Sequence, residues 1–231
     1  MDISQKTDQP HGFLLIDKPA GMTSHDVVQA VRRVTGVRRV GHAGTLDPFA
    51  TGLLIVGVGR ESTRELGGFL GQDKEYEATM RLGAVSDTQD LDGEITTTDG
   101  ELPDRDRLLT AMESFHGEIS QVPPMYSAKK VGGRKLYELA RAGQEIERLP
   151  VQVRIESLDL LSFEPPLARF RVRCSSGTYV RTLAHDIGQK LGCGAYLTEL
   201  RRTAIGEIGI PRANPLSKLD ADSWTGLLWR A

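Results

Sequence analysis

The densest group of chemically capable side chains lies at residues 41–52, in the run GHAGTLDPFATG. Three glycines, one proline and two threonines predict an irregular loop, which an apolar strand candidate follows at residues 53–58. Loops carried by rigid strands often hold functional side chains. The Asp47 carboxylate could serve as a nucleophile or a base, whereas Asp47 before Pro48 is also typical of a type I turn. The pattern alone favours the turn, but it does not explain why His42 lies so near this carboxylate.

A second group, SSGTYVR at residues 175–181, joins an arginine-rich strand candidate to a predicted amphipathic helix. Tyr179 and Arg181 fall on the first turn of that helix, away from its apolar stripe. An arginine at a helix N-terminus can bind an anion, and it lowers the pKa of a neighbouring carboxylate, which then stays ionised. In the structural alternative, Ser176 or Thr178 caps the helix, Arg181 pairs with an acidic residue, and Tyr179 packs. Both interpretations stay open at this point.

Two further groups carry weaker signals. Tyr76 lies in the run KEYE on the apolar side of an alternating pattern, so core packing is the usual explanation, although an aromatic ring at a pocket edge can stack on a base. The run LRRT at residues 200–203 is a short basic patch. The sequence has no phosphate-binding GxxxxGK[ST] run, no complete dinucleotide fingerprint and only scattered histidines. It therefore signals no cofactor and no metal.

The elements that must position these residues follow from hydrophobic periodicity. Strands are predicted at residues 13–16, 53–58, 75–82, 151–155 and 168–174. Helices are predicted from a Ser24 cap to just before Gly36, at residues 62–70, from Pro103 through Phe115, at residues 134–142 and at residues 178–191. Their irregular order predicts an α+β fold with a mixed, mostly antiparallel central sheet flanked by helices. The sequence has no repeat or low-complexity linker, which favours a single domain.

Composition narrows the class of protein. The chain has 231 residues, of which 39% are hydrophobic and 26% charged, with a net charge of −2, as in an ordinary globular domain. The polar N-terminus, the short apolar runs and the two isolated cysteines, Cys174 and Cys193, argue against a secretory signal, a membrane span and a disulfide scaffold. We therefore expect a protein of the reducing cytoplasm.

Charge is distributed unevenly along the chain. Residues 73–106 contain eleven acidic and three basic residues, whereas residues 12–64 contain seven basic against four acidic ones and residues 168–203 seven basic against two. Such runs are usually solvated faces, but the segregation also permits a basic face that binds a polyanion. Such a face would include Arg169, Arg171 and Arg173, which the alternation of strand 168–174 turns outward.

Taken together, these groups resemble the TruB-type tRNA pseudouridine synthases. The resemblance runs from about residue 12 to residue 206. It rests on KPxGxTS at residues 18–24, GTLDP within the loop 41–52, KEY at 74–76, SGTYVR at 176–181, and LRRT at 200–203 followed by Gly206. It implies a pseudouridine synthase fold and an isomerase that converts uridine to pseudouridine at position 55 in the T-loop of tRNA. The reaction would proceed by base flipping, without cofactor or metal.

The resemblance also implies roles for individual residues. Asp47 corresponds to the catalytic aspartate, Arg181 to its arginine partner, and Tyr76 to the tyrosine that stacks on the base. The residues expected to bind the substrate are His42, which would enter the T-loop, Tyr179 and Leu200, which would line the uracil pocket, and Lys18, Arg201 and Arg202. Lys18 lies in the motif that supports the catalytic loop.

The implied partner is tRNA, bound at its T-loop and stem; we expect a monomer with no obligate protein partner and no membrane contact. The alternative is an RNA-binding protein that remodels tRNA without catalysis, although an ionised Asp47 facing a polyanion favours the enzyme. We expect a disordered lead-in at residues 1–11, a catalytic domain at 12–210, and a short C-terminal tail at 211–231. Such a tail lacks the complete PUA-type domain that members of the family commonly carry.

Overall fold

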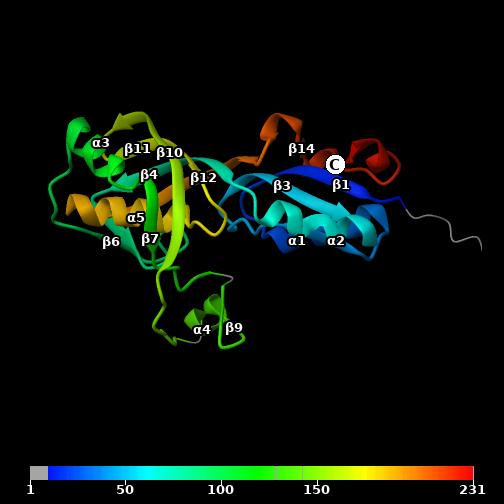
Figure 1. Cartoon of the computed structure of the whole chain (residues 1–231), viewed down its shortest axis with the longest axis horizontal. Helices are drawn as coiled ribbons and strands as arrows, with labels where there is room; N and C mark the ends of the chain where they lie inside the picture. The colour runs from blue at the N-terminus through cyan, green and yellow to red at the C-terminus, as the bar shows by residue number, and fades with distance from the viewer. Residues whose placement is uncertain (1–9, 128, 142, 231) are drawn as a thin grey trace, which may run out of the picture. The chain divides into compact units, whose positions relative to one another are not determined.

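The chain divides into two compact units in a computed structural model that describes residues 10–127, 129–141 and 143–230 (Figure 1). The first unit comprises Met1–Gln72 together with Ile205–Ala231, and the second comprises Asp73–Ala204. Most of the expected lead-in, residues 1–9, lies outside the described residues. The expected domain boundaries at residues 12 and 211 stay predictions.

The first unit is built around two long antiparallel strands. Its elements are β1 (Gly12–Lys18), α1 (Ser24–Thr35), β2 (Val40–Ala43), β3 (Thr51–Val58), α2 (Arg60–Leu70), β13 (Ile208–Gly209), β14 (Asn214–Pro215) and β15 (Leu228–Trp229), with short 3-10 helices at Ile210–Arg212, Leu216–Lys218 and Trp224–Leu227. β1 pairs with β3 along its whole length, β2 pairs with β3, and β15 pairs with β1, all antiparallel. β14 pairs with β1 in parallel, which makes the sheet mixed.

Both faces of β1 and β3 are buried, which explains why these strands read as continuous apolar runs. On one face, alternate residues such as Leu14 and Leu54 pack against Val27 of α1 and against Trp224. On the other face, the intervening residues of both strands pack against Leu66 and Phe69 of α2. The two helices therefore cover opposite faces of the same strand pair.

The start of α1 differs from the predicted cap by one residue. Thr23, rather than Ser24, is the N-cap, because its hydroxyl accepts from the Asp26 N–H while the Asp26 carboxylate accepts from the Thr23 N–H in a reciprocal capping box. This leaves the Ser24 hydroxyl available to a loop far away in sequence. Gly36 ends the helix in the left-handed conformation, as predicted.

The second unit contains a largely antiparallel sheet. Its elements are β4 (Lys74–Leu82), β5 (Ala84–Ser86), β6 (Ile95–Thr97), α3 (Arg105–Glu113), β7 (Gly117–Gln121), β8 (Lys130–Val131), β9 (Arg134–Lys135), α4 (Leu136–Arg141), β10 (Val151–Glu164), β11 (Leu167–Cys174), α5 (Val180–Leu191) and β12 (Ala195–Ile205). The strands lie in the order β12-β4-β11-β10-β7, and β4, β11, β10 and β7 pair antiparallel in turn. The predicted α+β fold with a mixed, mostly antiparallel sheet is confirmed.

The predicted alternation of β4 and β11 is also confirmed. Ala78 and Met80 of β4 and Phe170 and Val172 of β11 are each at most 2% exposed, whereas the three arginines of β11 face the other way. In the described residues, no helix is both long enough and apolar enough to span a membrane.

Asp186, on α5, makes the stability of the fold dependent on pH. Burial raises the pKa of its carboxyl to about 6, against about 3.9 in an unfolded chain. Between pH 4 and pH 6 the unfolded chain therefore holds fewer protons than the folded one, so the free energy of unfolding falls as pH rises through this window.

Asp186→Asn removes this titration, and we expect it to melt higher than the wild type by on the order of 3 °C at pH 7. The difference should shrink towards pH 4, as followed by thermal denaturation at both pH values. Asp159→Asn, at an exposed position of β10, controls for the loss of one charge. A constant difference from pH 4 to pH 7 would contradict the prediction.

Candidate active site

The Asp47 loop follows β2 and precedes β3. The predicted irregular loop begins later than expected, because residues 41–43 continue β2 and pair with β3. Asp47 is half-buried, and the Ala50 N–H donates to its carbonyl over 3.1 Å. The turn interpretation and the functional interpretation are therefore compatible, since a tight turn is what presents this carboxylate.

Lys18, at the end of β1, holds the loop from one side. Its side chain is fully buried, and its ammonium donates to the carbonyls of Pro19, Met22 and Pro48 over 2.9, 2.7 and 3.3 Å. A buried cation is tolerated only when its donors are satisfied, so these three carbonyls are fixed around one point. This is the supporting role that the resemblance implied, and a direct contact between Lys18 and substrate stays a prediction.

Ser24 holds the loop from the other side. Its hydroxyl accepts from the Leu46 N–H over 2.8 Å and lies 3.3 Å from the Leu46 carbonyl, to which it donates. Asp47 therefore lies between two anchored neighbours, Leu46 and Pro48. The backbone that carries the carboxylate is set by β1 and α1 rather than by the loop itself.

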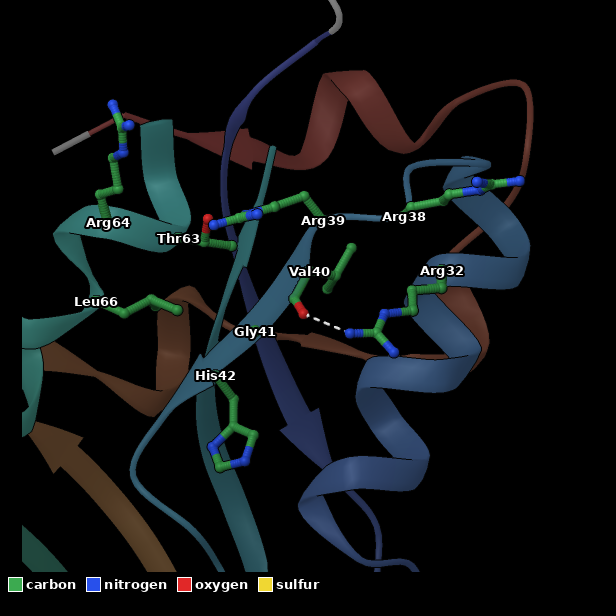
Figure 2. A pocket seen from close by; sticks show the side chains of 9 residues that line it. All are labelled: Arg32, Arg38, Arg39, Val40, Gly41, His42, Thr63, Arg64 and Leu66. Atoms are coloured by element: carbon green, nitrogen blue, oxygen red, sulfur yellow. Dashed lines mark hydrogen bonds between the residues drawn. The ribbon is translucent and has the colours of Figure 1, made fainter. Parts of the chain in front are cut away.

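A basic cavity of about 330 Å³ lies in the same unit (Figure 2). Its polar lining comprises Arg32, Arg38, Arg39, Arg64, Thr63 and His42. Arg32 is held in place because its guanidinium donates to the Val40 carbonyl over 3.0 Å, and Arg39 reaches from the start of β2 towards Thr63 on α2 (Figure 2). Four arginines are among the residues that line this hollow, and their positive charge favours an anion, although the guanidinium groups of Arg38 and Arg64 extend outward from it (Figure 2). Of these residues the sequence predicted only His42, and the excess of bases in residues 12–64 was the available signal.

Arg181 lies in the first turn of α5, in the second unit, and is almost completely buried. One terminal nitrogen, Nη1, lies 3.1 Å from the Asp90 carboxylate and donates to the Thr88 carbonyl over 2.7 Å. The other, Nη2, donates to the Tyr126 carbonyl over 2.9 Å. The structural alternative that Arg181 pairs with an acidic residue is thus correct, and it fixes the guanidinium rather than excluding a functional role.

Asp90 is itself held by the loop between β5 and β6. The Thr88 hydroxyl donates to its carboxylate over 2.6 Å, and the Asp92 N–H does so over 3.0 Å. Gln89, in the left-handed conformation with φ of 66°, accepts from the Thr182 hydroxyl over 2.8 Å. The sequence prediction missed Asp90, because it is one of eleven acidic residues in its stretch and no motif distinguishes it.

The remaining predicted residues of this unit lie on α5 and on two neighbouring strands. Tyr179 is the N-cap of α5, so its predicted place on the first turn is wrong by one residue. Tyr76 is half-buried on β4, on the same face as Ala78. Leu200, Arg201 and Arg202 all lie on β12, the neighbour of β4.

Burial distinguishes the two arginines of the LRRT run. Arg202 is only 1% exposed, whereas Arg201 is partly exposed. Burial lowers the pKa of Lys74, at the start of β4, and the positive charge of Arg202 lowers it further. Contacts between these residues and a nucleic acid stay predictions, and for Arg202 such a contact requires its buried side chain to become accessible.

The outward arginines of β11 are already engaged in ion pairs. Arg169 and Arg171 both contact the Glu77 carboxylate, over 2.6 and 2.7 Å, and the hydrogen bond from Arg171 lowers the pKa of Glu77. Arg173 contacts Glu156 over 2.9 Å. A phosphate would have to compete with these carboxylates, which weakens the case for this face as the main anion surface.

Removing the charge of Asp90 should destabilise the second unit strongly. Asp90→Asn keeps the volume of the side chain but removes the negative charge that lies 3.1 Å from the buried Arg181 guanidinium. We expect the free energy of unfolding to fall by about 3 kcal/mol, as measured by urea denaturation. Asp92→Asn, at an exposed position of the same loop, should change it by less than about 0.5 kcal/mol; equal losses in both variants would contradict this account.

Comparison with known proteins identifies the family. The model of the TruB family pseudouridylate synthase N-terminal domain matches residues 32–180, and that of the tRNA pseudouridylate synthase B C-terminal domain matches residues 181–225. The tRNA pseudouridine synthase B of Chlamydia abortus is 48% identical over 204 residues, which cover 88% of this chain and 86% of that protein. That of Opitutus terrae is 50% identical over 212 residues, covering 91% and 87%.

A solved structure agrees with this result. The crystal structure of a Cbf5-Nop10-Gar1 complex contains a chain that is 31% identical and superposes with a TM-score of 0.72. The match covers 93% of the present chain and 55% of that one, so the present chain spans about half its length. With family models that together match residues 32–225 and relatives about half identical over most of their length, the chain belongs to the TruB family of pseudouridylate synthases.

Proposed function

We propose that this chain isomerises the uridine at position 55 in the T-loop of tRNA to pseudouridine, with Asp47 as the catalytic carboxylate. One observation carries the proposal: β2 connects the basic cavity directly to the Asp47 loop, since His42 lines the cavity and Asp47 follows five residues later. An anion-binding surface and a rigidly held carboxylate therefore share one structural support. Membership of the family does not support the alternative of a remodelling protein without catalysis.

The chemistry requires only groups that this chain itself carries. The C–N bond between sugar and base breaks and a C–C bond forms, without change of oxidation state, so no hydride carrier is needed. An ionised Asp47 can attack the base, attack the sugar or remove a sugar proton, and these routes stay open. Tyr76, or a water beside it, would then help to remove the proton from C5. Arg181 is the third proposed catalytic residue, on the resemblance described above.

The basic cavity supplies the binding energy that base flipping consumes. Extracting a stacked uridine costs roughly a few kcal/mol, and contacts between arginines and phosphates can offset this cost. Arg38, Arg39 and Arg64 are proposed to hold the backbone of the T-loop or stem while His42 enters the loop. Tyr179 and Leu200 are proposed to line the uracil pocket.

We propose further that the enzyme acts as a monomer in the cytoplasm. Its two cysteines, Cys174 and Cys193, are buried and unpaired, which suits a reducing compartment. Burial raises the pKa of the Cys174 thiol to about 12, so this group stays protonated and unreactive.

Asp47→Asn tests the reaction and its proposed catalytic group together. The variant keeps the volume of the side chain but cannot ionise, so we expect release of tritium from tRNA labelled at uridine C5 to fall by at least about 10³-fold. Binding of tRNA should remain within about threefold of the wild type, as measured by filter binding.

Asp222→Asn, at an exposed position of the same unit, is the matched control and should release tritium at the wild-type rate. A folded, tRNA-binding wild type that releases no tritium would refute the proposed function. Full release by Asp47→Asn would refute the role of Asp47 alone.

Charge reversal in the basic cavity tests the proposed RNA surface. Arg39→Glu with Arg64→Glu removes two phosphate contacts, so the affinity for tRNA should fall and the slope of log K against log salt should become shallower by about 2. The control is Arg60→Glu, an exposed residue of α2 outside the cavity lining. An equal loss of affinity in the control would show that net charge, rather than the cavity, binds the RNA.

A further inference from the structure

The N-terminus of α5 is held in an unusual way. Its N-cap residue is Tyr179, which adopts an extended conformation with φ of −100° and ψ of 105° and makes no side-chain cap hydrogen bond. Helices usually begin at Ser, Thr, Asp or Asn, whose side chains accept from the first free N–H groups. Neither Ser176 nor Thr178 takes the capping role considered from the sequence; the Thr178 hydroxyl donates to the Ser175 carbonyl instead.

The Gln121 side chain secures Tyr179 from a distant strand. Its Oε1 accepts from the Tyr179 N–H over 2.8 Å, and its Nε2 donates to the Tyr179 carbonyl over 3.1 Å. Gln121 is fully buried, so both hydrogen bonds form away from water, where an unmet amide group would be costly. One side-chain amide thus hydrogen-bonds both the N–H and the carbonyl of a single residue, as a residue of a neighbouring antiparallel strand would.

Gln121 can act as a fixed point because its own backbone is fixed. It is the last residue of β7 and pairs with Val151 of β10 in the antiparallel ladder. Its main chain is thus tied to the sheet while its side chain is committed to Tyr179. The edge strand β7 thereby fixes the position of the N-cap residue of α5.

This grip complements the contacts that hold Arg181. The Arg181 guanidinium is fixed by Asp90 and by the carbonyls of Thr88 and Tyr126, but its backbone lies two residues after Tyr179. A shift of the backbone at Tyr179 would move the Cα atom of Arg181 relative to its guanidinium group. Because the Gln121 amide holds the peptide groups before and after Tyr179, the backbone cannot rotate about Tyr179 as it could with a single hydrogen bond.

We infer that Gln121 is a positioning residue for the isomerisation, which sets Tyr179 and, through it, the start of the helix that carries Arg181. It has no role in contacting substrate or reacting atoms. The inference rests on the proposed function, since it takes its importance from the roles proposed there for Tyr179 and Arg181. It adds a residue from β7, a strand that contributes no side chain to the proposed site.

The test separates the rate of the chemical step from binding and from stability. Gln121→Met keeps the length of the side chain and removes both hydrogen bonds. We expect the single-turnover rate constant for tritium release to fall by about 10- to 100-fold, with the Kd for tRNA within about twofold of wild type. Hydrogen exchange in residues 178–184 should become at least about tenfold faster.

Two control variants separate positioning from general damage. Gln152→Met makes the same substitution at an exposed position of β10, and Val153→Ala removes buried volume beside it, 4% exposed in the wild type. Both should keep the wild-type rate constant at a temperature well below their melting points. The positioning role is overturned if Val153→Ala and Gln121→Met both lose tritium-release rate in the same proportion to their loss of unfolding free energy.

A second variant keeps the proposal testable if Gln121→Met does not fold. Gln121→Asn keeps the amide but shortens the side chain by one methylene, so it cannot make both hydrogen bonds to Tyr179 at their present lengths, and we expect a smaller loss of rate at unchanged Kd. Wild-type rate and wild-type exchange in a folded variant overturn the inference. If the wild type itself releases no tritium, the proposed function fails, and unchanged exchange at residues 178–184 would then overturn the positioning of Tyr179 separately.

Discussion

Satisfying buried positive charge is the constraint on which the proposed site depends. Lys18 and Arg181 carry their charges at 0% and 3% exposure, where a cation without partners would be prohibitively costly. Both cations contact backbone carbonyls from several segments. Lys18 donates to those of Pro19, Met22 and Pro48, and Arg181 donates to those of Thr88 and Tyr126 and pairs with the Asp90 carboxylate. Because a carbonyl can be brought to a fixed point only by fixing its backbone, each cation organises the loops around it.

Polar contacts of the same kind also hold two irregular loops of the protein in place. The turn around Asp47 is held by Ser24 at Leu46 and by Lys18 at Pro48, and the loop before β6 is held by its contacts with Arg181 and Thr182. Gln89 adopts an uncommon left-handed conformation within that loop. Its backbone N–H donates to the Ser86 carbonyl and its side chain accepts from the Thr182 hydroxyl, and these hydrogen bonds offset the conformational cost. Order in these segments comes from polar contacts across long sequence separations rather than from local propensity.

That distinction decides what the sequence could predict. The alternation of β4 and β11, the apolar runs of β1 and β3 and the stripe of α5 are local signals, and these elements match their predicted bounds to within two residues at each end. The helix predicted at residues 134–142 is wrong at its start, because Arg134–Lys135 form β9. The motifs also led to Asp47 and Arg181 as proposed catalytic residues, and these roles stay predictions. Asp90, Gln121 and the buried state of Arg202 carry no local signal, because each depends on partners brought together only by the fold. Polar residue types normally indicate exposure, so a buried arginine on β12 is read from sequence as a surface charge.

The discontinuity of the first unit has a consequence for how the chain is made. Its N-terminal part ends at Gln72, yet β1 receives β14 and β15 only from the last eighteen residues, and Trp224 completes the core beside α1. On the ribosome, the whole second unit is synthesised before β14, β15 and Trp224. During that time the edge of β1 that these segments cover stays unpaired. An unpaired edge of apolar sequence is a template for association. The strand that begins the first unit is thus synthesised well before the segments that cover its edge and complete its core.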